Sequence, residues 1–156
     1  MLVVGDVVEV EVRNVAVFGI FCHHQDQEIL VRIPDISWIA CFASCRQFAE
    51  PGDRFLVKIL NVDSNTREVA ASLKALHPDP WVAGLLKVGA VHLARVVRRV
   101  EKADRCNDQA GYLLELVPGG YVMLCAHEAL LDTKQSLFVK VCMSEISRRA
   151  VSVLVA

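Results

Sequence analysis

Long hydrophobic runs are missing from this sequence of 156 residues. Charged or polar residues interrupt every apolar run well short of the ~18 residues that a membrane-spanning helix needs. The N-terminal residues 1–6 also lack the basic region, apolar core and small-residue cleavage site of a secretory signal. We therefore expect a protein without a membrane segment, located in the cytoplasm.

Because no secretory signal is present, we expect the six cysteines to be reduced thiols. Two of them, Cys125 and Cys142, lie inside apolar runs. Free cysteines in such runs behave as small hydrophobic residues. The sequence therefore predicts that these two side chains lie in the core.

The sequence has little net charge, with a formal value of −1 at pH 7. This excludes the strongly basic balance expected of a protein that binds duplex DNA by its phosphates. The charge is unevenly divided. Residues 1–80 carry seven Lys and Arg against eleven Asp and Glu, and residues 81–156 carry ten against seven. Any general attraction to phosphate is therefore expected from the second half or from local patches.

Recognisable catalytic motifs are missing as well. The sequence has no nucleophile elbow, no phosphate-binding Gly-x-x-x-x-Gly-Lys loop and no dinucleotide-binding glycine pattern. Residues 22–24 (Cys-His-His) and the pair Cys41 and Cys45 include residue types that bind zinc, but their spacing is not that of the usual paired ligands. We therefore predict no enzyme activity, no metal site and no cofactor.

What the first half does contain is a series of short β-rich segments. In residues 8–13 valines alternate with charged residues, which is typical of a half-buried strand. Four more β-rich segments follow at residues 17–22, 29–33, 54–62 and 68–73, separated by turn-forming residues. Five strands within 80 residues predict a small closed β-barrel.

The second half is predicted to be another barrel. Two prolines near Trp81 disfavour regular structure and mark a boundary. Beyond it, residues 88–91 and 138–141 weakly repeat residues 4–7 and 56–59. We therefore expect an all-β protein of two tandem OB-type five-stranded barrels, with domains at residues 1–76 and 86–156 and a linker at 77–85.

The first half resembles the S1 domain family, which is named for the repeats of ribosomal protein S1. The matching segments stand in the family's order and cover about half of the chain. They are Val4-Gly5-Asp6-Val7-Val8, Phe18-Gly19-Ile20-Phe21, Leu30 to Trp38, Pro51-Gly52-Asp53, Val57-Lys58-Ile59, Asp63, Arg67, Ser72-Leu73-Lys74 and Asp79-Pro80-Trp81. The resemblance implies an OB barrel that binds RNA, and it makes residues 86–156 a degenerate second copy.

The resemblance also implies a binding face. Phe18 and Phe21 would be the stacking aromatics, with Gly19 allowing a bulge that brings both to one side. Arg32 stands where the family has a surface histidine, and a guanidinium can both stack on a base and pair with phosphate. Further polar members of this face are expected to be Asp63, Arg67, Lys58 and Lys74.

Each of these residues also has an ordinary structural interpretation. Phe18 and Phe21 would then fill the core, and Arg32 would be a solvated strand residue. Asp63 and Arg67 would form a turn-stabilising ion pair of little net energy, and the two lysines would be exposed charges.

The favoured function is non-catalytic binding of single-stranded RNA, with single-stranded DNA as a related ligand, because stacking accepts every base. The alternative is a protein-interaction module on an OB scaffold that has lost nucleic-acid binding. Its protein partner would dock on the OB face, on the apolar loop 38–48 or on the second barrel. Phe42 and Phe48 in that loop could be either core residues or part of a contact surface.

Overall fold

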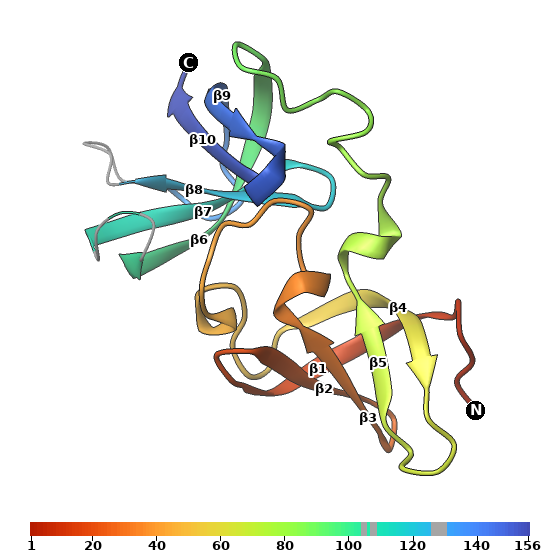
Figure 1. Cartoon of the computed structure of the whole chain (residues 1–156). Coiled ribbons are helices and arrows are strands. Elements are labelled where there is room, and N and C mark those ends of the chain that lie inside the picture. The colour runs from red at the N-terminus through yellow and green to blue at the C-terminus, as the bar shows by residue number, and fades with distance from the viewer. Residues whose placement is uncertain (104–105, 107–108, 126–130) are drawn as a thin grey trace. The chain divides into compact units, whose positions relative to one another are not determined.

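A computed structural model of the chain describes residues 1–103, 106, 109–125 and 131–156. Its strands fall into two compact units, which are shown in Figure 1. The first unit comprises residues 1–36 and 44–77, and the second comprises residues 37–43 and 78–156. In the described part of the chain the only helical elements are single 3₁₀ turns: η1 (Ile33–Asp35), η2 (Cys45–Gln47), η3 (Lys74–Leu76) and η5 (Ile146–Arg148). The expectation of an all-β protein is confirmed.

The first unit is a closed five-stranded barrel with strand order β1-β2-β3-β5-β4. Its strands are β1 (Val7–Val15), β2 (Gly19–His24), β3 (Gln27–Arg32), β4 (Arg54–Val62) and β5 (Val69–Ser72). All pairs are antiparallel except β3 with β5, and β4 pairs back onto β1 to close the ring. The predicted barrel is confirmed, and each strand lies within a few residues of its predicted position.

The period-two pattern of the sequence explains this barrel. Alternate residues of a strand point to opposite faces, so every second apolar side chain points inward. Val10, Val12, Ile20, Ile29, Val31, Val57 and Ile59 are all buried in this way. Burial also raises the pKa of Cys22 to about 12 and that of Cys45 to about 11, so both remain unreactive thiols at neutral pH.

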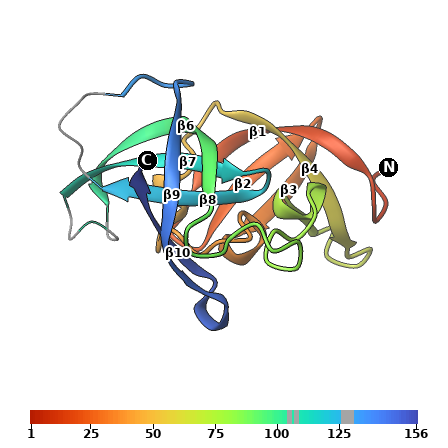
Figure 2. The same cartoon turned by 90° about the horizontal axis from the view of Figure 1, so that it is seen from above.

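The second unit contains a five-stranded antiparallel sheet with strand order β10-β9-β6-β7-β8. Its strands are β6 (Val91–Ala103), β7 (Gln109–Val117), β8 (Gly120–Cys125), β9 (Ser136–Glu145) and β10 (Ala150–Val155); Figure 2 shows them from above. When β6 is matched to β1 and the later strands follow in chain order, this sheet has the strand order of the first barrel. It differs in being open between the strands that correspond to β3 and β5. In the described residues β8 and β10 are not paired, so a second closed barrel is not formed. That this unit is a degenerate second S1 copy stays a prediction.

Residues 37–43 lie in the second unit, which differs from the predicted domain of residues 1–76. The backbone N–H of Trp38 donates to the carbonyl of Gly119 at 2.9 Å, and that of Ala40 donates to the carbonyl of Arg149 at 2.8 Å. Ile39 is 1% exposed and belongs to the core cluster of this unit. The other boundary, between His77 and Pro78, falls at the start of the predicted linker.

The apolar loop 38–48 combines buried residues with exposed ones. Phe42 and Phe48 are both core residues, as one of the two interpretations of the sequence proposed. The Phe48 ring packs against the ring of Phe55, with centroids 6.2 Å apart. These two rings are therefore covered, whereas Trp38 in the same loop is only partly buried.

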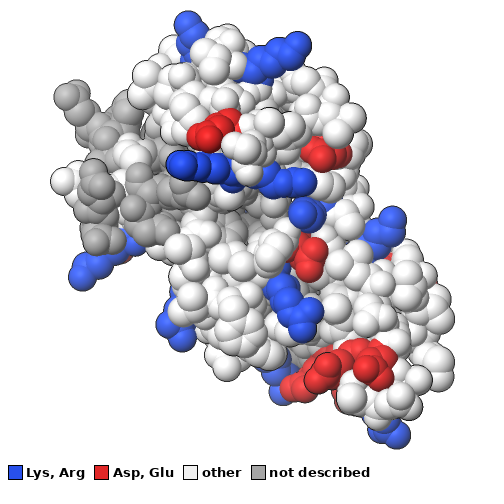
Figure 3. Space-filling model, viewed as in Figure 1, with Lys and Arg blue, Asp and Glu red and all other residues white. Residues whose placement is uncertain are grey.

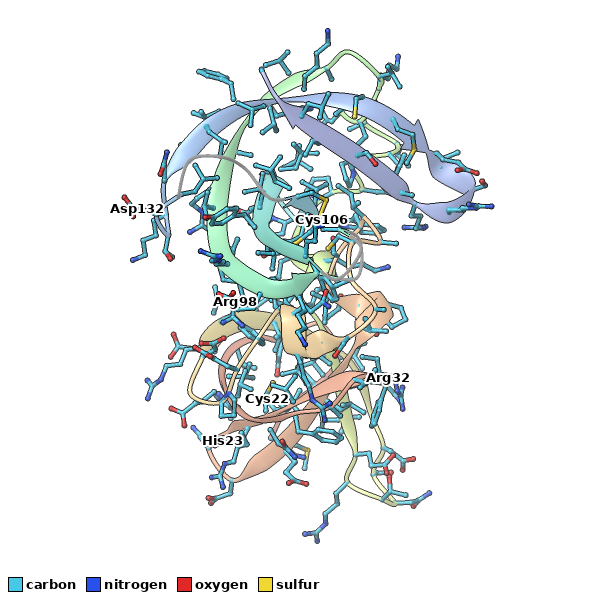
Figure 4. The ribbon with its side chains drawn as sticks, turned by 90° about the vertical axis from the view of Figure 1, so that its left-hand side faces the viewer. Cys22, His23, Arg32, Arg98, Cys106 and Asp132 are labelled. Carbon is cyan, nitrogen blue, oxygen red and sulfur yellow. A yellow bond between two sulfur atoms is a disulfide. The ribbon has the colours of Figure 1, made fainter. Side chains whose placement is uncertain are left out.

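Two expectations about cysteines are wrong. Cys106 and Cys125 form a disulfide, with their Cα atoms 5.3 Å apart; the bond is visible beside the Cys106 label in Figure 4. Cys125 and Cys142 are both exposed rather than buried in the core, and the Cys142 thiol donates to the carbonyl of Ser152 at 3.2 Å. Sequence composition did not reveal the disulfide because its two cysteines lie 19 residues apart on different elements. Among the described residues no helix is long and apolar enough to cross a membrane.

Candidate nucleic-acid interface

The outer face of β2, β3 and β5 carries a groove. Phe21 of β2 lies opposite Leu30 of β3, and Leu30 lies opposite Ala70 of β5. These three residues form an apolar row across three strands. The groove also has a polar rim, to which β3, the end of β4, the β2–β3 turn and the β4–β5 turn contribute. Its members are Asp26, Gln27, Glu28, Arg32, Asn61, Asp63, Thr66, Arg67 and Glu68.

Phe18 and Phe21 both lie at the protein surface, so the core-filling interpretation of these rings is wrong. Their side chains are 57% and 36% exposed. The two rings make an edge-to-face contact with centroids 5.8 Å apart, which is a favourable geometry for an aromatic pair. The structure therefore brings the two predicted aromatics together, and Phe21 lines the groove.

The two rings share a side for a reason other than the predicted bulge at Gly19. Phe18 lies in the bend between β1 and β2, before β2 begins, so strand alternation does not apply to it. The irregular register lies instead on the neighbouring strand, where Val12 and Asn14 of β1 pair with consecutive residues of β2.

Gly19 serves a different purpose, which is to make room for Leu30. A Cβ atom at Gly19 would lie 2.9 Å from Cδ1 of Leu30 and 3.2 Å from the carbonyl oxygen of Val31. Such distances are shorter than an ordinary van der Waals contact. The missing side chain therefore allows Leu30 to lie against β2 as the floor of the groove.

Arg32 extends the polar rim at the end of β3. It lies opposite Gly19 and is exposed, whereas Cys22 on the same pair of strands is buried; both are labelled in Figure 4. Within the described part of the chain, Arg32 forms no salt bridge. Its guanidinium is therefore available for a ligand.

Asp63 and Arg67 belong to the turn between β4 and β5. The Asp63 carboxylate accepts from the backbone N–H groups of Asn65 and Thr66 at 2.9 and 3.2 Å. These hydrogen bonds, from Thr66 first and Asn65 next, hold the pKa of Asp63 below its usual value. Arg67 adopts a left-handed backbone conformation with φ of 62°. Asp63 therefore shapes the turn, and it makes no ion pair with Arg67 in the part of the chain that the structure describes.

Lys58 and Lys74 do not line the groove. Lys58 lies in the middle of β4, between Val7 of β1 and Ser72 of β5. Lys74 begins η3 and interacts with Asp35. Burial raises the pKa of Asp35, and the charges of Lys74 and then Arg32 oppose that rise. The structure therefore unites Phe21, Arg32, Asp63 and Arg67 in one groove and leaves the two lysines outside it.

Sequence reasoning missed the acidic side chains of the groove, which are Asp26, Glu28 and Glu68. The β2–β3 turn supplies Asp26, and Glu28 is on the outward face of β3, in line with Leu30 and Arg32. Figure 3 shows acidic atoms gathered on the end of the first unit that carries these turns. The alternation of β3 could have revealed Glu28, since residues 28, 30 and 32 share one face.

The model of the S1 RNA-binding domain family matches residues 2–74. The chain is also similar to the small ribosomal subunit protein bS1 homologue of Bacillus cereus, with 33% identity over 117 residues. That match covers 74% of this chain and 28% of the relative. Polyribonucleotide nucleotidyltransferase of Streptococcus mutans is 37% identical over 78 residues, which are 49% of this chain and 10% of that enzyme.

Among solved structures, the chain resembles the solution structure of GSP13 from Bacillus subtilis. The match covers 56% of this chain and 73% of GSP13, with 21% identity and a TM-score of 0.45. The chain spans well under half the length of the bS1 homologue and of the polyribonucleotide nucleotidyltransferase.

Proposed function

Since residues 2–74 belong to the S1 RNA-binding domain family, we propose that the groove over β2, β3 and β5 binds single-stranded RNA without catalysing a reaction. Family membership supports nucleic-acid binding in general. The preference for single strands and the assignment to this groove rest on the chemistry of the residues that line it.

The observation that carries the proposal is the exposed pair Phe18 and Phe21 beside Arg32. Unpaired bases are held by stacking on aromatic faces, with cations near the backbone. The apolar row formed by Phe21, Leu30 and Ala70 gives a base a flat surface to cover. Arg32 and Arg67 lie on the rim, where they can pair with phosphate.

Stacking of this kind gives measurable but modest affinity. Each base stacked on an aromatic ring contributes about 1–3 kcal/mol. Since the rings accept any base, single-stranded DNA is a related ligand, and a preference for RNA would have to come from contacts to the 2′-hydroxyl.

We expect Phe21→Ala to weaken the binding of a labelled single-stranded oligonucleotide by roughly five- to 150-fold, the loss of one stacked base. Fluorescence anisotropy at low and moderate salt is the measurement. Phe138→Ala is the matched control, because Phe138 in β9 is 59% exposed but lies in the second unit, outside the groove. Affinity should fall as salt rises, and equal effects of the two substitutions would contradict the proposal.

The acidic residues of the groove favour a second candidate function. A groove with more carboxylates than guanidinium groups repels phosphate, as expected of an OB scaffold that serves as a protein-interaction module. If no oligonucleotide binds even at low salt, where phosphate contacts are strongest, this second function is the better one.

A further inference from the structure

We propose that the acidic end of the groove selects bases that carry an exocyclic amino group, so that cytosine is bound in preference to uracil. This inference rests on the proposed function and gives the same groove a base preference. It follows from the separation of charges along the groove.

The outward face of β3 changes from acidic to basic along its length. Glu28, Leu30 and Arg32 occupy alternate positions, and the residues between them, Ile29 and Val31, are buried. At ~3.3 Å per residue, Glu28 and Arg32 are separated by roughly 13 Å along the strand. Arg32 therefore serves the phosphates of a bound strand, whereas Glu28 faces a different part of the ligand.

The β2–β3 turn and the β4–β5 turn meet at the acidic end of the groove. The Gln27 side chain donates to the carbonyl of Arg67 at 3.1 Å and to that of Glu28 at 2.8 Å. This links the β2–β3 turn to the β4–β5 turn. As a result, Glu28 from one side and Glu68 from the other line the same end of the groove.

The carboxylates at this end are free to accept hydrogen bonds. Asp26, Glu28 and Glu68 are exposed, and within the described residues their carboxylates have neither a hydrogen bond nor an ion pair. The Asp63 carboxylate, by contrast, already accepts two backbone N–H groups. Three acceptors without partners therefore stand beside an apolar surface on which a base can stack.

The chemistry of the bases then decides which one fits. Carboxylates accept hydrogen bonds from the N4 amino group of cytosine. Uracil has a carbonyl oxygen at that position, and its lone pairs face the carboxylate unfavourably. The Watson–Crick edge is open to such contacts only in a single strand. Both bases are pyrimidines that stack on the rings in the same way. A difference in their binding affinity therefore measures the effect of the carboxylates.

The test compares labelled oligo(C) and oligo(U) of equal length on the full chain at one salt concentration. A good base-specific contact is worth ~1–3 kcal/mol, so we expect oligo(C) to bind at least about fivefold more tightly. In the double variant Glu28→Gln, Glu68→Gln the ratio should fall towards one, chiefly because oligo(U) binds better. Glu9→Gln is the control, since it removes an exposed carboxylate of the first unit that does not line the groove.

The outcomes separate this inference from the proposed function. Equal binding of the two oligonucleotides by the wild-type chain overturns the base preference and leaves RNA binding in place. A preference that survives in the double variant overturns the role of the carboxylates. Failure of both oligonucleotides to bind at low salt overturns the proposed function and the base preference together.

Discussion

Gly19 is the residue on which the shape of the groove depends most directly, because Leu30 occupies the space of its missing side chain. We expect Gly19→Ala to lower the free energy of unfolding by about 1–3 kcal/mol, the usual cost of overpacking a well-packed site. Urea denaturation measures this. In a Leu30→Ala background, Gly19→Ala should lower the free energy of unfolding by less, since Cδ1 of Leu30 is gone. An equal loss in both backgrounds would contradict the close contact between residue 19 and Leu30.

Residue types alone predicted much of this surface, but the reasons were incomplete. The two phenylalanines and Arg32 could be singled out because they resemble the family's pattern. The bend that places Phe18 beside Phe21 leaves no sign in the sequence, since Val17 and Phe18 read as ordinary strand residues. Lys58 and Lys74 were predicted on the same face but do not line the groove. The prediction failed because the sequence does not show how far each side chain lies from the groove.

At the scale of elements, the disulfide joins Cys106, which lies between β6 and β7 in the sequence, to Cys125 at the end of β8. A cross-link that closes a loop of this size is expected to contribute about 3 kcal/mol, mainly by restricting the unfolded chain. We expect the Cys106→Ser, Cys125→Ser variant to lose about that much stability in the second unit. Tryptophan fluorescence during denaturation is the readout, because both tryptophans, Trp38 and Trp81, belong to this unit.

Reduction of the wild-type chain provides an independent check on the disulfide. A thiol reductant should shift the denaturation midpoint of the wild type to that of the double variant and leave the variant unchanged. Cys142→Ser is the matched control because Cys142 is an exposed free thiol. A wild-type midpoint that does not respond to reductant would show that the cross-link contributes nothing.

The strands themselves were predictable, because period-two alternation is a local signal. Strand pairing in the second unit was not, since the sheet order depends on contacts between segments far apart in the chain. In the first barrel, Leu30 pairs with Ala70 to join β3 and β5. No such pair joins β8 and β10 in the described residues, and composition could not have shown this difference.

At the scale of the whole molecule, Ile39 is the residue that anchors residues 37–43 in the second unit. It is 1% exposed and packs in the same cluster as Leu114 and Val122. We expect Ile39→Ala to destabilise the second unit by about 2–5 kcal/mol, as for other buried isoleucines. The tryptophan denaturation midpoint measures the loss.

Ile146→Ala is the control for this prediction, because Ile146 is 67% exposed in the same unit. A midpoint that moves no further for Ile39→Ala than for this control would contradict the assignment. The sequence could not reveal the position of residues 37–43, since their hydrogen-bond partners Gly119 and Arg149 are far along the chain.

The excursion of residues 37–43 into the second unit has a consequence for synthesis on the ribosome. Domains usually fold in order as they leave the exit tunnel, the N-terminal one first. Here the first barrel has its whole sequence once His77 has emerged, yet the loop between β3 and β4 must wait for Gly119 and Arg149, which are made later, before its hydrogen bonds to them can form. Until the strands of the second unit emerge, we therefore expect the nascent barrel to carry an uncovered Ile39, whose packing partners all lie in that unit.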